Sequence, residues 1–129
     1  MSTYIDADVI VRWEKGEFDL LAWIDERPDE PLAFPATVWQ QLCFGIFGWQ
    51  PDRAAKRERF LRLLSAVPVL PFARVHALRA AQLAADLKHT TIGFADFQIA
   101  ATALVDGAQL LSFNRNHFKR VPGLVLAPL

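Results

Sequence analysis

Residues 92–124 read IGFADFQIAATALVDGAQLLSFNRNHFKRVPGL, and the rest of the chain can be placed around this stretch. After Asp96, apolar residues recur every three or four positions, which is typical of a helix with one buried face. Gly107 ends that helix, residues 109–113 form a short apolar strand, and residues 114–117 leave it as a polar loop. In an α/β sheet, one helix and one strand bring Asp96 and the polar loop to the same edge.

Length and composition favour a single globular domain. The chain has 129 residues, of which 53% are hydrophobic and 22% charged. Fourteen basic and fourteen acidic residues give a formal net charge of zero, so there is no overall basic surface of the kind common in nucleic-acid-binding proteins. Any contact with nucleic acid would therefore depend on local basic groups.

The single cysteine, Cys43, excludes an internal disulfide and a cysteine-rich zinc site, and it is typical of a reducing compartment. The first residues include Asp6, Asp8 and Arg12 where a signal peptide has an apolar core. No apolar run approaches the length of about 18 residues that a membrane span requires. We therefore expect a cytoplasmic protein with no membrane partner.

Short apolar segments alternate with helical patterns along the whole chain. We expect five strands, at residues 3–5, 32–34, 67–71, 109–113 and 124–126. Alternation of this kind predicts an α/β fold with three layers, in which helices cover both faces of a short parallel sheet. Two prolines in the third segment predict that it lies at the edge of the sheet.

Two helix starts carry recognisable capping residues. Asp8 is placed to cap the first helix, and Thr37 with Gln40 matches a capping box. The helix that Thr37 opens is apolar on nearly every face as far as Gly48, so it is either deeply buried or covered by another chain. We expect a partner surface for part of it.

Polar side chains gather where the predicted strands end. Asp6 follows the first strand, Gln41 lies on the helix after the second, and Asp96 and Asn114 flank the fourth. Right-handed crossovers place all four at the carboxyl edge of one sheet. Converging carboxylates repel each other unless a hard cation such as Mg²⁺ or Mn²⁺ neutralises them. Taken singly, however, an acid at a strand end is more often a cap or turn former.

Three blocks resemble the PIN-domain proteins, and most closely the VapC-type toxins of bacterial toxin–antitoxin pairs. The most specific block comprises residues 92–104 together with Gly107, residues 110–114 and residues 117–124. The opening Tyr4-Ile5-Asp6-Ala7-Asp8-Val9-Ile10-Val11 and the segment Gln41-Leu42-Cys43-Phe44-Gly45 resemble the family's first two motifs. The blocks occur in the family's order across essentially the whole chain, so we expect one PIN domain over residues 1–129.

The resemblance implies a magnesium- or manganese-dependent endoribonuclease, inhibited by a VapB-like antitoxin and assembled as a homodimer. Asp6 and Asp96 match metal-binding acids, and Asn114 matches a position that is Asp or Asn. His117 stands where another acid can occur. Gln41 departs from the pattern, because the family has Glu there, and an amide brings no charge.

Two hypotheses follow from this departure. With Asp6 and Asp96 as the only firm carboxylates, the chain would bind one metal ion weakly and cut RNA slowly or not at all. It is then either a ribonuclease toxin or a non-catalytic interaction module with the same fold. Gln41 favours the module, whereas the presence of both acids favours the enzyme.

Basic residues beside the expected cleft are candidates for RNA contacts. Arg115, Lys119 and Arg120 are placed to meet phosphates. His117 has three interpretations: a phosphate contact, a proton donor to the leaving oxygen, or an exposed loop residue. The basic segment from Arg53 to Arg62 is expected to be a solvated helix face.

Overall fold

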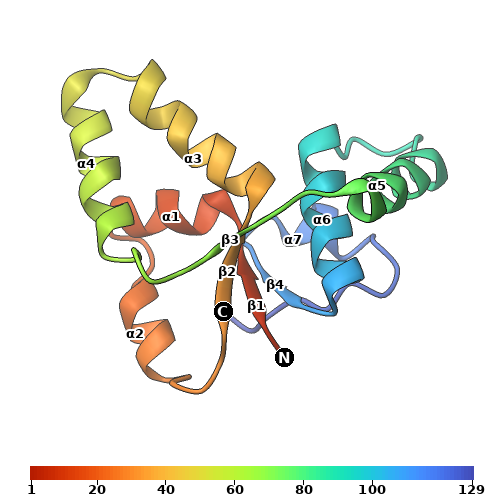
Figure 1. The fold of residues 1–129 in the computed structure, drawn as a ribbon, viewed down its shortest axis with the longest axis horizontal. Coiled ribbons are helices and arrows are strands. Elements are labelled where there is room, and N and C mark those ends of the chain that lie inside the picture. Colours follow the sequence, from red (N-terminus) through yellow and green to blue (C-terminus); the bar gives the residue numbers. More distant parts are fainter.

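The computed structural model describes residues 1–129 and confirms an α/β fold with a parallel sheet. The elements are β1 (Thr3–Ile5), α1 (Ala7–Glu14), α2 (Leu20–Asp25), β2 (Leu32–Pro35), α3 (Ala36–Gly48), α4 (Pro51–Arg62), β3 (Val69–Leu70), α5 (Arg74–Asp86), α6 (Phe94–Asp106), β4 (Gln109–Leu111) and α7 (Arg115–Phe118). Helices lie on both sides of the sheet, with α1 to α4 on one side and α5 and α6 on the other (Figure 1). No helix combines the length and the apolar character needed to cross a membrane.

The sheet has four strands rather than the predicted five, in the order β3-β2-β1-β4. All pairings are parallel. In the pairing of β1 with β4, Ile5 lies opposite Leu111. The expected last strand is reduced to a single bridge between Leu126 and Leu110. Gly123, with a φ of 82°, turns the chain just before this segment, and Pro128 has no N–H with which to extend it. As predicted, β3 is an edge strand.

The first helix begins two residues earlier than expected. Asp6, and not Asp8, is the N-cap of α1, and its carboxylate accepts a hydrogen bond from the N–H of Ala7 at 2.8 Å. The predicted capping box at Thr37 is also wrong, because α3 already begins at Ala36 and has no side-chain cap. Asp8 is therefore free for another role.

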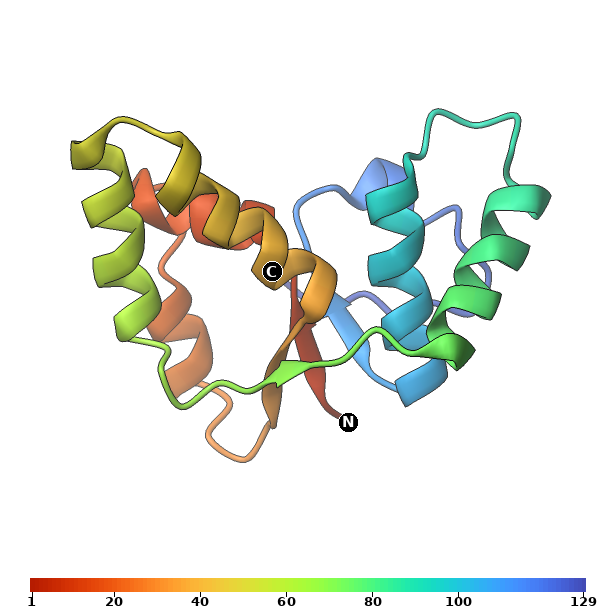
Figure 2. The ribbon, with the colours of Figure 1, turned by 45° about the horizontal axis from the view of Figure 1, so that its top comes forward.

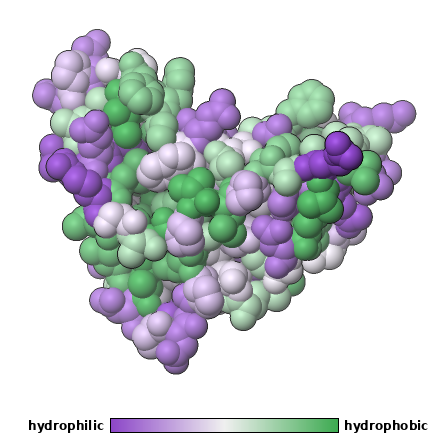
Figure 3. All heavy atoms as spheres, in the orientation of Figure 1, coloured by the Kyte–Doolittle hydropathy of each residue, from purple (hydrophilic) through white to green (hydrophobic).

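Helix α3 has one buried face and one exposed face. Val38, Leu42 and Gly45 lie in the core, whereas Phe44 is 67% and Phe47 is 87% exposed. The expectation of a face left open for a partner agrees with this exposure. The space-filling view shows hydrophobic surface on both arms of the molecule and a notch between them (Figure 3).

The basic segment in α4 is not wholly solvated. Arg57 is only 1% exposed and forms a buried ion pair with Glu14 on α1. Its Nη1 also donates to the carbonyl of Leu42 at 3.1 Å, so that one side chain joins α1, α3 and α4. Arg57 is buried because its side chain points inward from α4, between α1 and α3.

Candidate active site

Asp6 occupies the end of β1 and is held from two sides. It is 6% exposed, its Oδ1 accepts from the N–H of Ala7, and its Oδ2 accepts from the hydroxyl of Ser112 at 2.7 Å. Burial and, next, the negative charge of Asp8 raise the pKa of Asp6 to about 7. Hydrogen bonds from Ser112 and Ala7 act in the opposite direction but are outweighed. The sequence prediction of Asp6 at a strand end is confirmed.

Asp8 belongs to the same group, which corrects its predicted role as a cap. Both of its carboxylate oxygens lie 3.2 Å from the backbone nitrogen of Phe113, which donates to them. The hydroxyl of Ser112 is 3.4 Å away. Burial raises the pKa of Asp8, and the hydrogen bond from Phe113 opposes the rise. Its position two residues after Asp6, as in the opening motif, was the signal that could have revealed it.

Asp96 lies in the first turn of α6 and contacts the polar residues that follow β4. Its Oδ2 is 3.3 Å from Asn114 Nδ2 and 3.3 Å from His117 Nδ1. Asn114 Nδ2 is also 3.1 Å from His117 Nδ1. The three side chains predicted to meet at this edge therefore do so, with His117 carried by the short helix α7 where a loop was expected.

Ser112 joins the two groups of side chains. Its hydroxyl donates to Asp6, and its oxygen accepts from the backbone N–H of Asn114 at 3.0 Å. This serine was not among the predicted site residues, although it lies in the predicted strand two positions before Asn114. Ser112 is fully buried, and a buried hydroxyl group requires hydrogen-bond partners within the protein, which Asp6 and Asn114 provide.

Gln41 lies on the exposed surface of α3 and makes no hydrogen bond with Asp6, Asp8 or Asp96. It lines a cleft together with residues of α6, including Ala95, the neighbour of Asp96. The helix thus places Gln41 on the side of the molecule where the acids lie. Its role as a ligand stays a prediction.

The basic residues near the site differ in their availability. Arg115 donates from Nη1 to the carbonyl of Ala127 at 3.1 Å and so also holds the C-terminal segment. Lys119 and Arg120 are exposed beyond α7. His117 is partly exposed, and its Nε2 lies 3.4 Å from the hydroxyl of Thr91.

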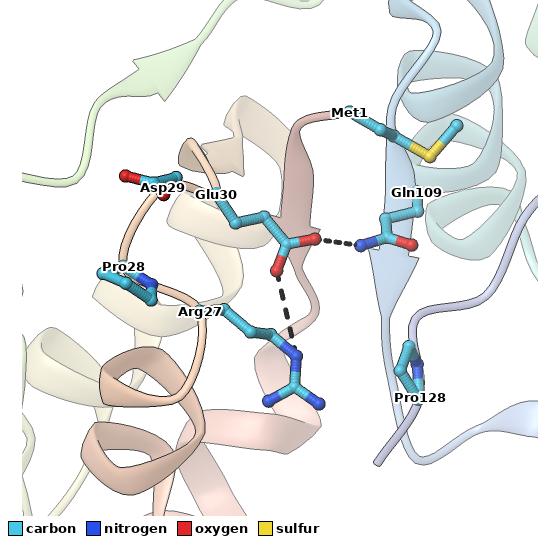
Figure 4. A pocket seen from close by; sticks show the side chains of 7 residues that line it. All are labelled: Met1, Arg27, Pro28, Asp29, Glu30, Gln109 and Pro128. Carbon is cyan, nitrogen blue, oxygen red and sulfur yellow. Dashed lines mark hydrogen bonds and ion pairs between the residues drawn. The ribbon is translucent and has the colours of Figure 1, made fainter.

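The largest cleft, about 490 Å³, lies at the opposite end of the sheet (Figure 4). Some of its polar groups pair with one another: Glu30 Oε1 accepts from the side chain of Gln109, whereas Glu30 Oε2 is buried without a hydrogen bond, 4.0 Å from Arg27 Nε. Gln109 also donates to Thr3 at 2.8 Å. Open α/β sheets bind ligands at the carboxyl ends of their strands, and this cleft is at the amino ends. It is not the candidate site.

The donor set at the carboxyl edge fits a hard divalent cation. The charges of Asp8 and Asp96 both act on Asp6, and none of the three acids forms an ion pair with a lysine or an arginine. The basic groups that act on them are His117, beside Asp96, and Arg12, whose charge lowers the pKa of Asp8. No three carboxylate, imidazole or thiol groups lie close enough together to enclose an ion. Mg²⁺ is commonly bound by one or two carboxylates and keeps several waters, so an open arrangement suits it. The pKa of Asp6 is raised first by burial and then by the negative charge of Asp8, and a bound cation would favour its charged form.

Comparison with known proteins agrees with this geometry. Residues 3–124 match the PIN domain family. Ribonuclease VapC10 of Mycobacterium tuberculosis is 33% identical over 117 residues, which cover 88% of this chain and 84% of that protein.

Two solved structures have the same fold. The VapBC-1 structure from nontypeable Haemophilus influenzae aligns with a TM-score of 0.83 and 26% identity, covering 98% of this chain and 97% of that one. VapBC2 from Rickettsia felis, bound to a DNA fragment from its promoter, also has a TM-score of 0.83, at 22% identity and 98% coverage of both chains. Since the family match extends over nearly the whole length, this chain belongs to the PIN-domain family and, within it, resembles the VapC ribonucleases.

Proposed function

We propose that this protein is a metal-dependent endoribonuclease and the toxin of a toxin–antitoxin pair. The observation that carries the proposal is the position of Asp6, Asp8 and Asp96 at the carboxyl edge of the sheet, none of them in an ion pair with a lysine or an arginine. PIN-domain ribonucleases are generally metal-dependent. Asp8 adds a carboxylate to the two counted from the sequence, which removes the main argument for an inactive interaction module.

Asp6 and Asp96 would hold the ion, and Mg²⁺ or Mn²⁺ is the cation that oxygen ligands of this kind suit. When bound, such an ion lowers the pKa of water and stabilises the charge that develops on the phosphoryl group. Ser112 orients Asp6, and Asn114 with His117 orients Asp96, so each ligand is held by a second residue. Gln41 is the further catalytic residue predicted from the motif.

RNA phosphates would lie against the basic residues that follow the site. Lys119 and Arg120 are exposed there and free to meet a backbone, and His117 is partly exposed beside them. Arg115 contributes less, because it is bonded to the Ala127 carbonyl. We propose the cytoplasm as the location of the enzyme, because cellular RNA would be the substrate.

The partners follow from the relatives and from the exposed aromatic residues. The structural relatives are VapBC complexes, in which the toxin is found with its antitoxin. A VapB-like antitoxin is the regulator we propose, with a homodimer as the assembly. Phe47, which is 87% exposed, is a side chain that a protein partner would cover.

The test is cleavage of labelled RNA by purified, antitoxin-free protein in Mn²⁺ and in chelator. We expect cleavage that requires the metal, is lost in Asp96→Asn and persists in the control Asp86→Asn, which alters an exposed acid at the end of α5. Cleavage that survives in chelator, or in Asp96→Asn, would contradict the proposal. No cleavage of any RNA by the native chain would favour the interaction module.

A further inference from the structure

A second cleft lies beside the acids, between α3 and α6. It has a volume of about 340 Å³, near the lower end of the range of about 300–1,000 Å³ for small-molecule sites. Six residues line it: Thr37, Gln40, Gln41, Phe44, Ala95 and Gln98. The two helices face each other across the notch between the arms (Figure 2). One lining residue, Ala95, immediately precedes Asp96 in the first turn of α6, so the cleft and the candidate active site share this end of the helix.

The lining carries no charge, and its polar side chains are three amides and one hydroxyl. Three of its six residues are glutamines, and none is acidic or basic. The hydroxyl of Thr37 donates to Gln98 Oε1 at 3.2 Å, which leaves the Nε2 group of that amide for a ligand. Gln40 and Gln41 are exposed. Neutral amides that offer both donors and acceptors suit a neutral, hydrogen-bonding ligand better than a phosphate or a carboxylate.

An aromatic ring completes the cleft. Phe44 is 67% exposed and lies three and four positions after the two glutamines, on the same face of α3. A ring exposed beside amide groups is the combination with which proteins stack and read unpaired bases. A helical peptide would instead need a continuous apolar stripe in its groove, which the glutamines interrupt.

We propose that this cleft, which we call the amide cleft, holds one unpaired base of the RNA. This base belongs to a nucleotide next to the phosphodiester that is cut at the acids. Phe44 stacks on the base, and the glutamines read its edge, because side-chain amides pair with the donors and acceptors of bases. The substrate is then RNA whose nucleotide at the cut is unpaired, in a loop or a single strand, and not a continuous duplex. This inference rests on the proposed ribonuclease function.

The test combines a protein variant with removal of a base. The cut made by the native protein is first mapped on a labelled RNA hairpin, and each nucleotide flanking the cut is then replaced by an abasic one. Phe44→Ala is expected to lower kcat/KM about tenfold on intact RNA, since stacking of one base contributes about that factor or more. On the RNA that lacks the bound base, the same variant should cause no further loss. Gln98→Met is expected to act on the same nucleotide.

Matched controls separate this effect from general damage. Leu78→Ala removes an exposed apolar side chain and Gln82→Ala removes an exposed amide, both from α5 and outside the amide cleft. Both should cleave as the native protein does. Equal losses by Phe44→Ala on intact and abasic RNA, or no loss on either, would overturn the proposal. So would an effect confined to inhibition by an antitoxin, which would assign the cleft to a protein partner.

Failure of the nuclease itself would be distinguishable. If the native protein cut no RNA, equilibrium binding of the intact hairpin and of one made abasic throughout its loop would decide about the amide cleft. Weaker binding of only the intact RNA by Phe44→Ala would support a base in the cleft although the proposed enzyme had failed. Equal affinity of the native protein for both hairpins would overturn it.

Discussion

The hydroxyl of Ser112 donates a 2.7 Å hydrogen bond to Asp6 Oδ2, joining residues that are 106 positions apart in the sequence. The contact exists because β1 and β4 are parallel neighbours and Ile5 pairs with Leu111, so that the next residue of each strand meets at the carboxyl edge. Asp6 is thus placed by the sheet and not by a flexible loop. The pKa of Asp6 should therefore depend on the fixed neighbours of this residue, among them Asp8 and Ser112.

Removal of the charge of Asp6 should change how stability depends on pH. In the folded protein the pKa of Asp6 is raised from 3.8 to about 7, so the native state binds this proton more tightly than the unfolded chain does. The free energy of unfolding of metal-free protein should then fall as pH rises from about 4 to about 7, by the order of a few kcal/mol. We expect Asp6→Asn to lack this decrease, measured by urea unfolding in chelator between pH 4 and pH 8.

The control is Asp25→Asn, at the exposed end of α2. This variant should keep the decrease of the native protein. Parallel curves for the native chain and Asp6→Asn would show that Asp6 titrates as an ordinary carboxyl group.

Gln41→Glu should strengthen metal binding. The substitution adds a negative charge on the side of α3 that faces the cleft beside Asp96, and an exposed charge pair at close range contributes about 1 kcal/mol, or a factor of about five in affinity. Titration calorimetry with Mn²⁺ would measure it. Gln40→Glu adds the same charge one position earlier and should have a smaller effect; equal gains would mean that Gln41 has no special position toward the ion.

Most of the architecture could be predicted, because it rests on local signals. The pattern of apolar residues predicts the alternation of strands and helices. Asp6, Asp96 and Asn114 lie next to strands, and a parallel sheet brings the carboxyl ends of its strands to one edge. Contacts between helices that are distant in the sequence could not be predicted from it. The burial of Arg57 depends on how α4 docks against α1, which no nearby residue specifies.

The role of Asp8 was missed for a different reason. Asp6 and Asp8 both stand at the start of α1, and either can cap a helix. The extended backbone of Asp6, with a ψ of 156°, makes that residue the cap and turns Asp8 into the first turn, toward Phe113. A difference of two residues at a helix end lies beyond what residue preferences decide.

Gly45→Ala should destabilise the protein through overpacking. A Cβ atom at this position would lie 2.8 Å from the ring of Trp49 and 2.9 Å from Arg57 Nη1. The expected loss in the free energy of unfolding is about 1–3 kcal/mol. Gly48→Ala is the control, since its Cβ would be 3.3 Å from the exposed ring of Phe44, which can move. Equal stability of the two variants would show that α3 shifts to make room.

Glu14→Gln should be the more damaging of two changes at glutamates that pair with arginines. Glu14 accepts two hydrogen bonds from Arg57, one of 2.9 Å and one shorter. The guanidinium of Arg57 is buried and lies 4.5 Å from the centre of the Trp49 ring. Neutralising the carboxylate leaves a buried positive charge without its counter-ion, which costs about 3 kcal/mol or more. Glu17→Gln breaks only the exposed pair with Arg12, 3.7 Å long, and should cost less than about 1 kcal/mol. Urea unfolding of both variants at pH 7 measures the difference, and similar losses would mean that the interior around Arg57 admits water to solvate its charge.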